Sequence, residues 1–400
     1  MFAFLNATCC KFLMAQEITP MVDDRLDYGV ISNNEAAPLA PLVEDDGKKK
    51  PGLELTAFLS ATYDSNIFLN ATNGVADQVF RVGTIIAYKK GDPLETEGAF
   101  IDLTYKPTGV LFQERGTDNR IDHKALWSAG WRAKMITLSY GGGFAKLGDA
   151  TADTGEQANR TVLENEVRAA WEAREKLTFE VAAGAARTAY DAASFFDASE
   201  TFGETAIRYA YSPKTQVGLA YRVSRFDVDG ASRQNVQQLT GNMSWQPREK
   251  IQLSLQAGAE RRAAGNDSQI NPVFQSRINW GPRDGTKLYL TAYQNQQASA
   301  FLLGQNYKSL GVTAGISQCI GSHWTALLEG GRENISYSRV SGAGPSGRED
   351  QIYFIRPSLE YKLSDSLNVA IFYRVAKNAS NDTLFGYEQN LAGFEFNYRF

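Results

Sequence analysis

The chain has 400 residues, of which 43% are hydrophobic, 12% aromatic and 22% charged, and its formal net charge is −4. This charge and a pI near 5.5 argue against a nucleic-acid-binding protein, which normally carries a basic patch. A mean hydropathy of −0.34, and no apolar run of about 20 residues after the first fifteen, exclude a helical membrane protein. A membrane β-barrel stays compatible, because alternate residues of its strands face lipid and lumen.

The first predicted element, residues 1–15, resembles a signal peptide. Its apolar stretch ends at Ala15, a small residue suited to cleavage, but it has no basic start and Lys11 interrupts it. A start codon further upstream would explain both departures. Residues 16–52 combine four prolines with one acidic and one basic run, which predicts a disordered or loosely held periplasmic leader.

Residues 53–400 repeat one pattern, in which segments of about 10–14 residues alternate apolar and polar side chains between turns. About eighteen such segments are present, with sixteen as the alternative count because a weak segment such as 286–297 is easily missed. The prediction is an all-β fold, a transmembrane antiparallel up-and-down β-barrel. Such a barrel satisfies every backbone polar group within the bilayer by closing its sheet.

The connections alternate between short and long along this region. Short turns are predicted near residues 91–93, 132–134, 173–175, 212–214, 246–249, 282–285, 321–322 and 364–366. Longer polar connections are predicted at 64–77, 107–118, 147–159, 190–199, 228–233, 263–269, 298–304, 339–349 and 379–385. Tight periplasmic turns and larger outer loops give this alternation, and with both barrel ends periplasmic they require an even number of strands.

Aromatic residues lie beside the short turns, on the apolar face of each segment. Because amphipathic rings favour the membrane interface, we expect them to form an aromatic girdle in contact with outer-membrane lipid. The residues are Tyr88, Trp131, Trp171, Tyr211, Trp245, Trp280, Trp324 and Tyr361.

The C-terminal strand places Phe394, Phe396, Tyr398 and Phe400 on one face. This resembles the terminal signature of bacterial outer-membrane barrels, which implies recognition by the barrel-assembly machinery. The segment Ala61-Thr62-Tyr63-Asp64-Ser65-Asn66-Ile67-Phe68 resembles the opening of the β-barrel porin 2 family, a group that includes exopolysaccharide-associated barrels. The resemblance implies a channel in the bacterial outer membrane, with polysaccharide or an export system as a partner, and supplies no catalytic residues.

The polar face of the segments carries the charges that would line the lumen. These are Glu164, Glu166, Arg168, Glu180, Glu204, Arg208, Arg222, Arg277, Arg356 and Arg374. Counting from the turns, Arg168 is expected to face Glu180, Glu204 to face Arg222, and Arg356 to face Arg374. The last pair predicts either a patch that attracts anions or ordinary solvated lumen charge.

Polar groups in two long connections are expected to be solvated. They are Asp64, Asn66, Asn70, Asn73 and Asp77 in the first, and Asp149 and Asp153 in the third. Their spacing does not match a calcium loop, and no metal or cofactor is expected. We also find no G-x-S-x-G or H-E-x-x-H motif.

Three functions remain after these observations. The leading one is a non-enzymatic, porin-like channel for small polar solutes or polysaccharide. The second is a structural or surface-interaction barrel without an open pore. The third, an outer-membrane hydrolase, is disfavoured because the two histidines, His123 and His323, are poorly placed to serve a nucleophile.

Overall fold

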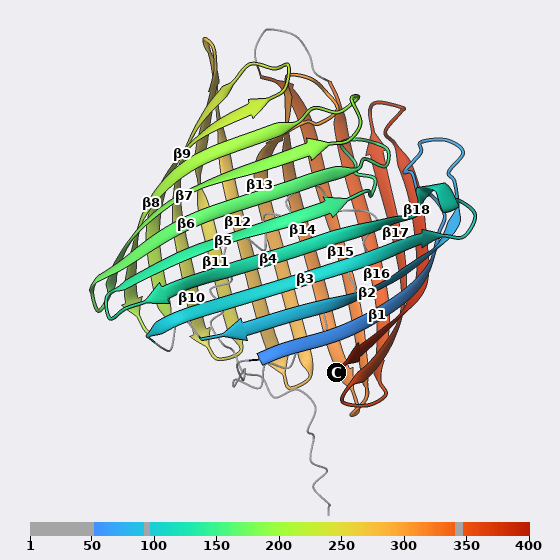
Figure 1. The fold of residues 1–400 in the computed structure, drawn as a ribbon, viewed down its shortest axis with the longest axis horizontal. Coiled ribbons are helices and arrows are strands. Elements are labelled where there is room, and N and C mark those ends of the chain that lie inside the picture. The colour runs from blue at the N-terminus through green and yellow to red at the C-terminus, as the bar shows by residue number, and fades with distance from the viewer. Residues whose placement is uncertain (1–51, 92–96, 341–346) are drawn as a thin grey trace, which may run out of the picture.

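The computed structural model describes residues 52–91, 97–340 and 347–400. Within these ranges eighteen strands form one antiparallel sheet in which each strand pairs with the next in sequence. The sheet closes into a barrel because β1 pairs with both β2 and β18, and the tilted strands wrap around a central space (Figure 1). The predicted fold class is confirmed, with eighteen rather than sixteen strands. The predicted signal-like segment and the leader up to residue 51 lie outside the described residues.

The strands have similar lengths all round the barrel. They are β1 Gly52–Asp64, β2 Asp77–Lys90, β3 Gly98–Phe112, β4 Arg120–Arg132, β5 Ile136–Leu147, β6 Arg160–Arg174, β7 Leu177–Tyr190, β8 Ala198–Ser212, β9 Thr215–Val228, β10 Gln234–Arg248, β11 Ile251–Ala264, β12 Asp267–Arg283, β13 Thr286–Ala298, β14 Gln305–Ile320, β15 Trp324–Arg339, β16 Glu349–Lys362, β17 Leu367–Ser380 and β18 Tyr387–Arg399. One short 3-10 helix, Gly116–Asp118, follows β3. No helix among the described residues is long and apolar enough to cross a membrane.

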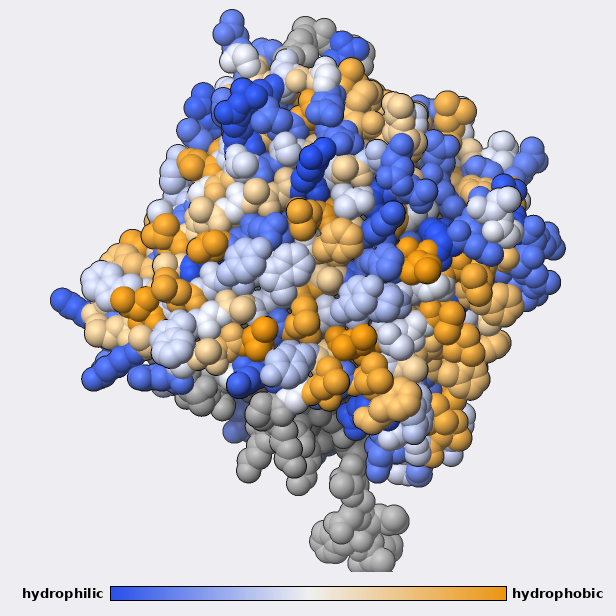
Figure 2. Space-filling view, in the orientation of Figure 1, coloured by the Kyte–Doolittle hydropathy of each residue, from blue (hydrophilic) through white to orange (hydrophobic). Residues whose placement is uncertain are grey.

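Alternation along each strand sorts side chains between two faces. In β18, Leu391 and Glu395 are buried inside the barrel, while Phe394, Phe396 and Tyr398 are exposed on its outer face. Figure 2 shows apolar and aromatic residues gathered over the outer wall, with polar residues concentrated toward its rims. An apolar exterior around a closed sheet is the arrangement that a bilayer requires.

The short and long connections gather at opposite ends of the barrel, which we call the turn end and the loop end. At the loop end one prediction was wrong: the connection expected at 263–269 is a two-residue hairpin, since Ala264 pairs directly with Asp267. Gly265 takes a positive φ of 60° there, which a tight hairpin turn needs and glycine adopts without steric cost. The predicted connection 339–349 lies partly outside the described residues.

Several inward glycines lie beneath aromatic rings of the adjacent strand. A Cβ placed on Gly184 would stand 2.6 Å from the ring of Phe202, and one on Gly311 would stand 2.4 Å from the ring of Tyr293. These rings therefore lie against the barrel wall instead of extending across the lumen. An aromatic ring that covers a glycine of the neighbouring strand also helps to fix the register between the two strands.

Candidate functional site: the lumen and its inward-folded loops

A ladder of charges runs along the lumen wall formed by β6 to β9. Arg168 lies 2.9 Å from Glu166, 2.8 Å from Glu180 and 3.8 Å from Glu204. Arg208 also contacts Glu180, at 3.0 Å. The ladder thus links predicted lumen residues on three consecutive strands.

The ladder continues onto β9 through Arg222. The register of β8 and β9 sets Glu204 opposite Arg222, and their side chains lie 3.9 Å apart. Arg222 also pairs with Glu200 at 3.0 Å and stacks 3.5 Å above the ring of Phe202. Glu164 lies on the same face of β6 and lines the cavity described below. Paired in this way, the charges form a wall of fixed hydrogen-bonding groups rather than a field of one sign.

The wall formed by β16 to β18 holds Arg356 and Arg374. The flanking pairs Ile355↔Val375 and Ser358↔Phe372 set these two arginines opposite each other, and both are buried. Glu395 on β18 lies 3.7 Å from Arg356, so a carboxylate stands beside the pair.

Polar and aromatic groups also surround the second arginine of that pair. Arg374 donates to Gln389 at 3.4 Å and faces the ring of Phe354. The third predicted arginine, Arg277, is exposed in the lumen on β12. Whether this wall attracts anions stays a prediction.

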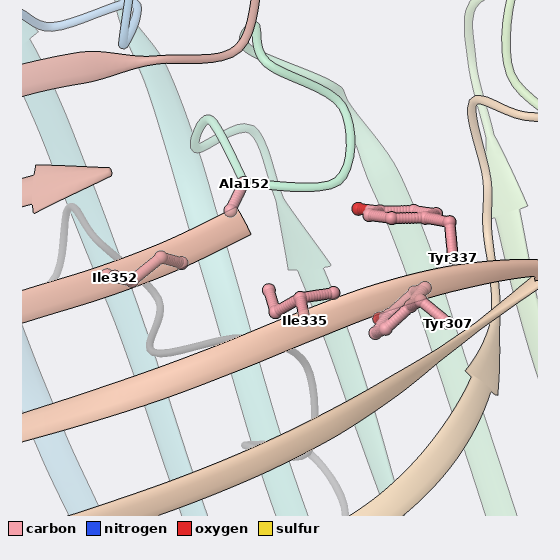
Figure 3. Close-up of a cluster of buried hydrophobic side chains, with 5 residues drawn as sticks. All are labelled: Ala152, Tyr307, Ile335, Tyr337 and Ile352. Carbon is pink, nitrogen blue, oxygen red and sulfur yellow. The ribbon is translucent and has the colours of Figure 1, made fainter. Parts of the chain in front are cut away.

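The connection between β5 and β6, residues 148–159, reaches across the barrel. Its Ala152 packs with Tyr307, Ile335, Tyr337 and Ile352 in a buried cluster on β14 to β16 (Figure 3). In a ring of eighteen sequentially paired strands, β14 lies nine positions from β5, which is half the circumference. This connection, which we call the crossing loop, therefore spans the lumen and docks on the opposite wall.

Asp153 fixes the tip of the crossing loop. Its carboxylate accepts hydrogen bonds from the Ser299 hydroxyl at 2.7 Å, the Ala300 N–H at 2.7 Å and the Tyr337 hydroxyl at 3.1 Å. Arg348 donates to the backbone carbonyl of Asp153 at 3.1 Å and also to that of Ala152. Burial raises the pKa of the Asp153 carboxyl, while these donors oppose the shift. The expectation that Asp153 is solvated was wrong, because the tip is held inside the barrel.

The other carboxylates expected to be solvated are buried too. Asp149 pairs with Arg160 at 2.8 Å. Asp64 accepts the backbone N–H of Asn66 at 2.8 Å and the side-chain amide of Gln389 at 3.0 Å. Asp77 is buried as well and accepts the N–H groups of the β3–β4 connection. These groups tie the loop end together, a role that spacing alone does not reveal.

Other long connections pack over the lumen beside the crossing loop. A chain of rings joins three of them: Phe195 lies 6.5 Å from Phe301, which lies 5.5 Å from Phe385. The guanidinium of Arg348 stacks 3.4 Å above Phe385. The β1–β2 connection adds Leu69, which packs on Ala150 of the crossing loop. The loop end of the lumen is thus narrowed by mutually supporting loops.

A cavity of about 360 Å³ lies next to the crossing loop, against the walls formed by β4 to β11 and by β13 and β14. Its lining includes Arg160, Glu164, Arg222, Glu260 and Arg262, together with aromatic and amide side chains. The arginines there already contact carboxylates: Arg160 contacts Asp149, Arg222 contacts Glu200 and Arg262 contacts Glu260. A polar solute in this space would meet donors and acceptors of both signs.

The predicted girdle residues lie at the turn end of the outer wall. Trp131, Trp171, Tyr211, Trp245, Trp280 and Trp324 are exposed there, and Tyr88 and Tyr361 are half-buried. Trp324 and Tyr361 face each other in register with ring centroids 4.5 Å apart. The C-terminal aromatics share the outer face, where Tyr398 and Phe400 pack edge to face at 4.8 Å.

The barrel is closed and antiparallel, has an even number of strands and an apolar exterior, and carries tight turns at one end and long loops at the other. These features define a bacterial outer-membrane β-barrel.

No family model and no curated protein matches the sequence. Three solved structures that are similar to the chain come from two bacteria. OccAB3 of Acinetobacter baumannii is 11% identical, with a TM-score of 0.49, and the match covers 87% of this chain and 99% of that one.

The two others come from Pseudomonas aeruginosa. OccK2 (OpdF), solved in complex with glucuronate, is 11% identical with a TM-score of 0.47, covering 87% of this chain and 97% of that one. The outer membrane protein opdK is 10% identical with a TM-score of 0.44, covering 87% and 99%. At these identities the likeness concerns the fold alone, and no residue role is transferred.

Proposed function

We propose that the protein is a porin-like channel through which small polar solutes cross the outer membrane passively. The observation that carries this proposal is the open cavity beside the crossing loop, because charged and amide side chains line it together with apolar ones inside a closed barrel. An eighteen-stranded barrel is wide enough to leave an aqueous lumen, as the porins of sixteen to eighteen strands do. The crossing loop then sets the width of the passage, and the groups around the cavity set which solutes pass.

The experiment is single-channel conductance of the purified, refolded protein in a planar bilayer. Discrete steps whose size grows with salt concentration support the channel. Heat-modifiable migration on a gel establishes that the protein under test is folded, so that silence cannot come from a misfolded sample.

A structural barrel without an open pore is the second candidate, because the loops at the loop end pack together across the lumen. Persistent silence from folded protein, both in the wild type and after the crossing loop is shortened, would favour it over the channel. Steps that appear only after shortening would instead identify a gated channel.

The same proposal includes the family, the passage of polysaccharide, the assembly route and the absence of catalysis. Membership of the β-barrel porin 2 family rests on the segment Ala61 to Phe68, and passage of polysaccharide rests on that resemblance. Assembly by the barrel-assembly machinery rests on the terminal aromatics. The absence of catalysis is proposed from the sequence, and a hydrolase screen on lipid and peptide substrates tests it.

A further inference from the structure

Five exposed basic side chains lie on the outer wall at the loop end, on strands from β5 to β17. They are Lys146 on β5, Arg225 on β9, Arg261 on β11, Lys308 on β14 and Lys377 on β17. Each lies within three residues of the end of its strand at the loop end. We call this set the basic belt.

Alternation shows that the basic belt points away from the lumen. Arg261 lies between Glu260 and Arg262, which both line the inner cavity. Lys308 lies between Tyr307 and Ser309, which are both buried inside. Since neighbouring residues of a strand point to opposite faces, these cations stand on the outer wall, at the edge of its apolar surface.

Most of this positive charge is not neutralised by the protein. Arg225 lies 3.3 Å from Asp227, and Lys377 lies 2.6 Å from Glu388. Among the described residues, Lys146, Arg261 and Lys308 have no carboxylate within ion-pair distance.

The strands on either side offer these three cations no carboxylate in register. Arg261 faces Gln237 and Ile270, and Lys308 faces Gln296 and Ser336. Lys146 faces His123 and Thr161. The three cations are therefore open to an anion from outside the protein.

We propose that the basic belt binds the phosphate groups of lipids in the outer leaflet. The belt lies at the boundary of the apolar wall, which is the level at which lipid headgroups meet a barrel, and its surplus charge complements phosphate. Because the cations are spread over strands from β5 to β17, about two thirds of the circumference, the surface fits a row of phosphorylated lipids rather than one docked protein. The proposal does not depend on whether the lumen conducts.

Binding of a fluorescent lipid A to the full-length barrel in zwitterionic detergent tests the proposal. The probe is used with both phosphates and after their removal. The test variant is Arg261→Gln with Lys308→Gln, and the matched control is Lys214→Gln with Lys250→Gln, which removes two exposed cations at the turn end. Glutamine removes the charge and keeps a polar, unbranched side chain, and heat-modifiable migration verifies that every variant is folded.

Wild type and control should bind the phosphorylated lipid equally, and the belt variant about 25-fold more weakly, since each basic side chain near an anionic lipid surface contributes about five-fold. Each single variant should lose about five-fold. All the proteins should bind the dephosphorylated lipid equally weakly. Equal binding of both lipids by wild type, or a belt variant within about two-fold of wild type, would overturn the proposal.

Discussion

Replacing Asp153 with alanine should release the crossing loop from the opposite wall. The substitution removes the acceptor of three hydrogen bonds, from Ser299, Ala300 and Tyr337, and leaves these donors buried without that partner. Leaving one buried donor without its acceptor costs about 1 to 3 kcal/mol, and three donors lose theirs here, so the total is at least about 3 kcal/mol. The ratio of docked to undocked loops should therefore fall by at least about a hundred-fold.

Single-channel recording in a planar bilayer measures the consequence. With the loop released, Asp153→Ala should conduct in larger steps, or flicker between two levels, where the wild type shows one smaller level. The matched control is Asp227→Ala, which removes an exposed carboxylate at the same end of the barrel. Asp227 forms ion pairs with Arg225 and Arg233. Steps of equal size and stability in Asp153→Ala and wild type would refute the idea that this contact sets the width of the lumen, as would an identical change in the control.

The remaining predictions concern pH, selectivity and assembly. The pKa of the Asp153 carboxyl is raised when the loop is docked, so the docked loop holds the proton more tightly than the undocked loop does. Docking is therefore strongest below the ordinary pKa of 3.8, and it weakens as the pH rises through the raised pKa. Wild-type conductance should fall as the pH is lowered toward 3.8, and a flat Asp153→Asn profile is expected. An equally steep profile in that variant would assign the effect to another group. Replacing Arg356 and Arg374 together with alanine should shift ion selectivity toward cations in reversal-potential measurements, and unchanged selectivity would leave ordinary lumen charge as the explanation. Deleting Phe400 should lower the amount of folded barrel in the outer membrane several-fold while refolding in detergent is unchanged, and normal amounts in cells would show that this residue is not needed for assembly.

The sequence predicts the barrel because period-two alternation and turn chemistry are local signals. Each apolar face, such as Phe394, Phe396 and Tyr398, is specified within one strand, and eighteen repeats of the pattern lead to the closed sheet. Even the weak segment 286–297 corresponds to β13. The hairpin at Gly265 was missed because the small and polar residues around it look like a loop, although Ala264 and Asp267 already pair as the ends of the two strands.

The docking of the crossing loop could not be predicted in the same way. Asp153 stands in a run of small, mostly polar residues typical of a solvated connection. Its partners Ser299 and Tyr337 are 146 and 184 residues away in sequence. These strands lie opposite the loop only in the folded barrel, so the contact depends on tertiary structure and leaves no local pattern in the sequence. The alanines Ala150 and Ala152 give a weak hint, since they are the apolar residues that make this loop fit against a wall.

The contacts of Asp153 also have a mechanical consequence for the barrel. The crossing loop leaves the wall between β5 and β6 and docks on β14 to β16, half the circumference away. The hydrogen bonds of Asp153 with Ser299 and Tyr337 therefore join two opposite walls through residues that are 146 and 184 positions apart in sequence. The crossing loop acts as a brace across the ring, in addition to the strand-to-strand pairing around it.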